Sequence, residues 1–224
     1  MTAGPTAAPA AGAQATGARE AVAFLALGDS YTIGEGVDAG DRWPLQLARA
    51  LRGEGVALED PRIIAATGWT TDELSAAIDA ADPPRGFGLV SLLIGVNNQY
   101  RGRPVDEYRA QFDALLARAA RFAGDRPGRV LVLSIPDWGV TPFAAASGRD
   151  RAAIARELDA YNAAALAACA ARGIGHVDIA PLSRARGGEP RMLAADGLHP
   201  SAALYAHWAR LALPAARRLL STHD

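Results

Sequence analysis

The chain has 224 residues with 23 basic and 24 acidic side chains, a net charge of −1, and half of its residues are hydrophobic. This balance excludes a strongly basic surface for nucleic acid or an anionic membrane, and the length suits one globular domain. All the basic residues are arginines, which excludes lysine chemistry such as a Schiff base, a Ser–Lys pair or a P-loop. The single cysteine, Cys169, excludes an internal disulfide and a cysteine metal site.

Residues 1–20 are rich in alanine, glycine, proline and threonine, without a basic start or a continuous apolar block. This composition predicts a disordered N-terminal tail rather than a signal peptide. No stretch approaches the apolar length of a membrane span. We therefore expect a protein of the bacterial cytoplasm with no nucleic-acid partner and no stable membrane insertion. The oligomeric state stays open.

From residue 21 onward, short apolar runs alternate with helical patterns. Short strands separated by helices predict an α/β fold with a parallel sheet covered on both faces. Right-handed crossovers would bring the carboxyl ends of these strands to one edge, where such sheets bind ligands. The strands are expected over 21–27, 62–66, 89–94, 130–135 and 174–179, and the helices over 43–52, 71–80, 104–122, 150–171 and 201–220.

Polar residues with catalytic potential follow these strands. Ser30 follows the first strand in a Gly-Asp-Ser run, Gly68 the second and Asn97 the third, while Asp196 and His199 lie after the fifth. A serine hydroxyl becomes a good nucleophile when a neighbouring base takes its proton. A carboxylate three residues before a histidine can accept the Nδ1 proton and leave Nε2 facing a serine. The sequence therefore predicts a catalytic triad of Ser30, His199 and Asp196.

At these residues, from about Phe24 to Tyr205, the chain resembles the SGNH subgroup of the GDSL hydrolases. The matching blocks are Leu27-Gly28-Asp29-Ser30, Gly68, Gly95-Val96-Asn97-Asn98 and Asp196-Gly197-Leu198-His199-Pro200. The third block usually has aspartate where this chain has Asn98. The resemblance implies a three-layer α/β/α sandwich with a flavodoxin-like five-stranded sheet, and one SGNH hydrolase domain over residues 21–224.

The resemblance also implies an oxyanion hole made by the backbone N–H groups of Ser30 and Gly68 and the amide of Asn97. The expected function is a serine esterase that cleaves small-molecule acyl esters through a covalent acyl-enzyme, with no cofactor and no metal. We expect a short acyl group because the loops are short and no lid-like segment is present. Substrate contacts are expected from Asn98, Tyr100 and Trp138. The alternatives are an SGNH acyltransferase or carbohydrate deacetylase and, from another class, a non-catalytic flavodoxin-like binding module.

Overall fold

In the computed structural model, which describes residue 1 and residues 21–221, five parallel strands form one sheet. The strand order is β2-β1-β3-β4-β5, as in flavodoxin-like sheets. The predicted tail lies, apart from Met1, outside the described residues. The strands are β1 (Phe24–Gly28), β2 (Arg62–Ala65), β3 (Leu89–Leu93), β4 (Val130–Leu133) and β5 (Gly175–Val177).

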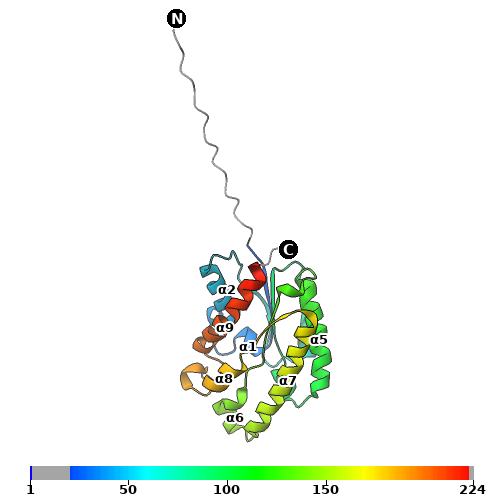
Figure 1. Cartoon of the computed structure of the whole chain (residues 1–224). Coiled ribbons are helices and arrows are strands. Elements are labelled where there is room, and N and C mark those ends of the chain that lie inside the picture. The colour runs from blue at the N-terminus through cyan, green and yellow to red at the C-terminus, as the bar shows by residue number, and fades with distance from the viewer. Residues whose placement is uncertain (2–20, 222–224) are drawn as a thin grey trace.

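Long helices cover both faces of this sheet (Figure 1). Helices α2 and α9 pack together in one layer, and α3, α5 and α7 pack in succession in the other. The three-layer α/β/α sandwich is therefore confirmed. The long helices are α2 (Trp43–Gly53), α3 (Thr71–Ala81), α5 (Val105–Phe122), α7 (Arg151–Arg172) and α9 (Ala202–Ser221).

The three central strands are the most deeply buried part of the fold. Every residue of β1, β3 and β4 is buried, whereas β2 and β5, at the two edges, are partly exposed. Central strands covered on both faces have no solvent side, which explains why they read as continuous apolar runs. Among the described residues, no helix combines the length and apolarity needed to cross a membrane.

Short helices were not predicted, because four to seven residues carry too little periodicity to identify a helix. Two of them bear site residues: Ser30 is the first residue of α1, and Asn97 lies in α4. The short α-helices are α1 (Ser30–Ile33), α4 (Val96–Tyr100), α6 (Pro142–Ala146) and α8 (Ala180–Arg186), and the 3-10 helices are η1 (Ala39–Asp41), η2 (Pro127–Arg129), η3 (Trp138–Val140) and η4 (Pro190–Met192).

The strand order places a topological switch point between β1 and β3. After β1 the chain crosses to β2 on one side, and after β3 it crosses to β4 on the other. The two connections diverge, which leaves a crevice at the carboxyl ends of these neighbouring strands. Ser30, two residues after β1, and Asn97, four residues after β3, lie at this point.

Candidate active site

Ser30 lies where β1 turns into α1. Asp29 caps this helix, and its Oδ1 accepts a hydrogen bond from the Tyr31 amide at 3.0 Å. The first N–H groups of a helix have no partner within the helix, so the backbone N–H of Ser30 is suited to bind an anion. The Ser30 side chain is only slightly exposed. The nucleophile candidate therefore sits on a short, capped turn at the edge of the sheet.

Asp29, beside the nucleophile candidate, is fully buried. Burial raises the pKa of its carboxyl to about 7, against the lowering effect of the hydrogen bond from the Tyr31 amide. Its second oxygen, Oδ2, and the neighbouring hydroxyl of Thr32 have no hydrogen-bond partner within the described residues. Asp29 therefore braces the turn through one oxygen and keeps the other in a low-dielectric environment.

The Asp196–His199 segment folds on itself into a tight loop. Oδ1 of Asp196 accepts hydrogen bonds from the backbone amides of Leu198 and His199, both at 2.9 Å. Gly197 has a φ of +67°, a left-handed conformation that glycine adopts at no steric cost. Below this loop, Leu193 and Pro200 form an antiparallel bridge. These local backbone contacts hold the loop and therefore fix the backbone position from which the His199 side chain extends.

The two side chains of this loop form a short contact. Nδ1 of His199 lies 2.6 Å from Oδ2 of Asp196. Partial burial raises the pKa of Asp196, but hydrogen bonds from the His199 ring and from two backbone amides outweigh it, and the pKa is lowered. The carboxylate is therefore ionised at neutral pH and accepts the Nδ1 proton. This tautomer leaves Nε2 free to act as a base.

Gly68 and Asn97 come from loops after β2 and β3. Gly68 has a φ of +85° and is the third residue of a turn that the Trp69 amide closes onto the Ala66 carbonyl. Positive φ at this position is the requirement of a type II turn, which favours glycine. Nδ2 of Asn97 donates to the Trp69 carbonyl at 2.9 Å. One hydrogen bond therefore orients the Asn97 amide and ties it to the Gly68 turn.

Ser30, Gly68, Asn97 and His199 line one pocket of about 210 Å³. Across residues 21–221 no hydrogen bond joins the Ser30 hydroxyl to the His199 ring, and catalytic hydrogen bonds are often long before substrate binds. The Tyr31 ring packs edge-on against the imidazole, with centroids 5.9 Å apart. The remaining wall is largely apolar and consists of Thr67, Val96, Tyr100, Trp138, Phe143 and Leu198.

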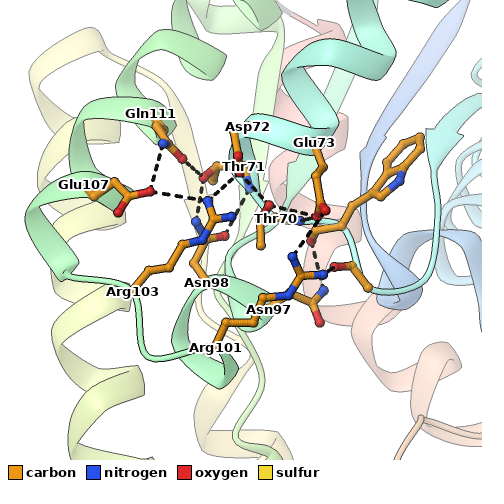
Figure 2. Close-up of polar contacts among 12 residues, drawn as sticks. Thr70, Thr71, Asp72, Glu73, Asn97, Asn98, Arg101, Arg103, Glu107 and Gln111 are labelled. Atoms are coloured by element: carbon orange, nitrogen blue, oxygen red, sulfur yellow. Dashed lines mark hydrogen bonds and ion pairs between the residues drawn. The ribbon is translucent and has the colours of Figure 1, made fainter.

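Of the three side chains expected to contact substrate, Tyr100 and Trp138 line this pocket and Asn98 does not. Asn98 is fully buried, and its amide bonds the backbone N–H and the hydroxyl of Thr71 at 3.1 and 2.7 Å. In Figure 2 it reaches Thr71, whereas Asn97 lies beside Arg101. Consecutive residues of a helix point in different directions, so of the two asparagines Asn97 faces the crevice and Asn98 does not.

Several residues of the site escaped the sequence analysis. Leu198 stands between two predicted triad members, so its position in the motif was a usable signal. Phe143 lies on α6, far from every motif, and Arg101 carries no pattern of its own. Gln99 accepts a hydrogen bond from the Trp138 indole at 2.9 Å, and Arg101 bonds the Gly68 carbonyl at 2.7 Å. Only the packing of distant loops reveals such contacts.

The chain matches a family of known enzymes. The sequence model of the GDSL-like Lipase/Acylhydrolase family matches residues 26–207, which include every residue of the pocket. The chain belongs to this family. It is accordingly an enzyme, a carboxylic ester hydrolase of the SGNH type, and not a non-catalytic binding module. A search of curated protein sequences found no match.

Solved structures share the fold of this acylhydrolase. TesA is 22% identical with a TM-score of 0.68, covering 88% of this chain and 99% of its own. A lipase/acylhydrolase from Enterococcus faecalis is 20% identical with a TM-score of 0.64, covering 91% and 99%. AlinE4, an SGNH-hydrolase family esterase, is 22% identical with a TM-score of 0.61, covering 91% and 98%. At these identities the similarity establishes the α/β fold over nearly the whole length of each neighbour.

Within the part of the chain that the structure describes, no group of three or more His, Cys, Asp or Glu side chains is arranged to hold a metal ion. Cys169 is buried in α7, and burial raises the pKa of its thiol to about 12. A thiol with a raised pKa is a poor nucleophile. Cys169 is therefore a residue of the buried core and not a candidate nucleophile.

Proposed function

We propose that the protein is a serine esterase that cleaves small acyl esters through a covalent acyl-enzyme, with Ser30 as nucleophile. The observation that carries this proposal is the pocket shared by Ser30 and His199, with His199 Nδ1 2.6 Å from Asp196 Oδ2. Nucleophile, base and orienting carboxylate come from two segments about 170 residues apart. Nucleophile and base line one pocket and the carboxylate is bonded to the base, which is the arrangement that acyl transfer by serine requires.

In the proposed mechanism, Ser30 Oγ attacks the ester carbonyl while Nε2 of His199 accepts its proton. Asp196 holds the imidazole and stabilises the imidazolium. The tetrahedral oxyanion is received by the N–H groups of Ser30 and Gly68 and by Nδ2 of Asn97. His199 then protonates the departing alcohol, which leaves an acyl-Ser30 ester. Water, deprotonated by the same imidazole, attacks this ester, and the imidazolium returns the proton to Ser30 Oγ as the acyl–Oγ bond breaks and the acid is released.

The substrate proposal rests on the size and lining of the pocket. Its volume of about 210 Å³ lies below the roughly 300–1,000 Å³ of sites for drug-sized ligands, which favours a small acyl group. The Trp138 indole donates to Gln99, whose amide in turn donates to Glu157 at 2.6 Å. These hydrogen bonds hold the wall in place, so a long acyl chain cannot easily displace it. We therefore expect the highest kcat/KM on the short members of a p-nitrophenyl ester series.

The deciding experiment compares Ser30→Ala with Ser147→Ala, which removes an exposed hydroxyl at the end of α6. Ser30→Ala should lower kcat by ~10⁴-fold or more, because only the oxyanion hole and binding remain. Ser147→Ala should keep wild-type turnover. A fluorophosphonate should label wild type at Ser30 and leave Ser30→Ala unlabelled. Near-normal turnover by folded Ser30→Ala would refute the proposal, and product analysis with an added alcohol would separate hydrolysis from acyl transfer.

A further inference from the structure

Arg101 is the residue after α4, and its guanidinium lies against the loop that carries Gly68 (Figure 2). Its Nη2 donates to the Gly68 carbonyl at 2.7 Å, and its Nη1 lies 3.2 Å from Oε1 of Glu73. The arginine therefore bridges the β2–α3 connection, at Gly68, and the first turn of α3, at Glu73. The triad and the expected oxyanion donors do not include it.

The Gly68 turn is weakly closed by its own backbone. The hydrogen bond from the Trp69 amide to the Ala66 carbonyl is 3.4 Å long, beyond the usual range of about 2.7–3.2 Å. Glycine adds no side chain to limit φ and ψ, so such a turn has several accessible conformations. Contacts from outside the turn must therefore determine the direction of the Gly68 N–H.

Two contacts from α4 and its end contribute that restraint, beside the hydrogen bond that the Thr67 hydroxyl donates to Glu35. Nδ2 of Asn97 donates to the Trp69 carbonyl at 2.9 Å, and Arg101 donates to the carbonyl immediately before it, that of Gly68. The guanidinium is itself held in place. Glu73 bonds Arg101 with Oε1 and accepts the Thr70 amide with Oε2 at 2.8 Å, at the start of α3. Two successive carbonyls are thus clamped by two side chains from one short segment.

We propose that Arg101 is a positioning residue: by holding the Gly68 carbonyl it restrains the turn in which the Gly68 N–H, which belongs to the preceding peptide unit, points at the oxyanion of the reaction. This inference rests on the proposed function, because it presupposes that Gly68 donates to that oxyanion. The Arg101 and Glu73 side chains are 43% and 41% exposed, so their ion pair adds little to folding stability. The principal effect of Arg101 is therefore on the turn, and it acts through Gly68 without touching substrate.

The test compares Arg101→Gln with Arg103→Gln. Arg103 is the matched control. Among the residues that the structure describes, it pairs with Asp72 and Glu107 in the same region, and it makes no hydrogen bond to the Gly68 carbonyl. Arg101→Gln should lower kcat on p-nitrophenyl acetate by ~10-fold, less than the ~10²–10³-fold typical of losing an oxyanion donor outright. KM should stay within about twofold, since the ground-state ester makes no demand on this N–H.

A second readout isolates the oxyanion. An alkyl trifluoromethyl ketone forms a tetrahedral adduct with the active serine, so its Ki should rise in Arg101→Gln by the same factor by which kcat falls. Arg103→Gln should leave kcat, KM and Ki within about twofold of wild type. If Arg101→Gln does not fold, as judged by thermal unfolding, Arg101→Lys decides. One ammonium cannot span both partners as the guanidinium fork does, so a reduced kcat with an unchanged KM is expected there.

Equal kcat values for folded Arg101 and Arg103 variants, or a change in KM alone, would overturn the inference. An unchanged Ki beside a reduced kcat would do the same. The Ser30→Ala variant separates this failure from failure of the proposed function. If Ser30→Ala is inactive and Ser30 is labelled in wild type while Arg101→Gln behaves like its control, only the role of Arg101 is refuted.

Discussion

Replacing Asn97 with alanine tests the oxyanion hole directly. The change removes an amide whose Nδ2 lies 2.9 Å from the Trp69 carbonyl and whose side chain lines the pocket. Loss of one such donor costs about 2.7–4 kcal/mol in the transition state, or ~10²–10³-fold in kcat. The oxyanion exists only after attack, so KM should change by less than about threefold. The lost bond to Trp69 should cost about 1 kcal/mol of folding stability.

The assay is steady-state hydrolysis of p-nitrophenyl acetate, combined with thermal unfolding. Gln46→Ala is the control, because Gln46 also donates its amide to backbone carbonyls, of Asp41 at 2.7 Å and Ala202 at 2.9 Å, outside the pocket. It should lose stability and keep kcat. A rise in KM with unchanged kcat in Asn97→Ala would refute the reasoning, since the amide would then contact only the ground-state substrate.

Three further substitutions and one treatment extend the test. Asp196→Asn puts an amide where the carboxylate accepts the His199 ring proton and should lower kcat by ~10³–10⁴-fold; near-normal kcat in the folded variant would contradict the orienting role of Asp196. Asn98→Asp should stay within about tenfold of wild-type activity, because a carboxylate can still accept the Thr71 amide. Asp29→Asn keeps the cap oxygen but cannot ionise. Burial raises the pKa of the Asp29 carboxyl from 3.8 to about 7. The wild type should therefore lose stability relative to this variant as pH rises from about 4 to 7, by up to roughly 4 kcal/mol in urea unfolding. Unfolding free energies of the two proteins that change with pH in parallel would contradict this burial penalty. EDTA should leave esterase activity unchanged, and a loss restored by a divalent metal would contradict the metal-free mechanism.

The elements that could be predicted from the sequence are those encoded by neighbouring residues. The buried strands β1, β3 and β4 read as apolar runs because both of their faces are covered. The long helices carry enough turns to display their periodicity, whereas α1 and α4 do not.

The pairing of Asp196 with His199 belongs to the same predictable class. It is a contact over three residues, and the backbone amides that hold it lie in the same loop. Ser30 could be placed beside it in advance, because parallel crossovers bring the ends of all strands to one edge of the sheet. The spacing of these residues along the chain and the topology of the sheet were sufficient to predict that they lie close together.

Only the tertiary structure decided how the residues of the proposed oxyanion hole are supported and which side chains form the wall of the pocket. Asn97 meets Trp69 across 28 residues, Arg101 meets Gly68 across 33, and Trp138 meets Gln99 across 39. The same packing turned Asn98 away from the pocket and into a buried bond with Thr71. The local sequence carries the hydrophobic periodicity that identifies each element as a helix or a strand. Contacts between loops depend on how separately encoded elements pack and on the direction in which each side chain leaves its helix, and no local pattern records that.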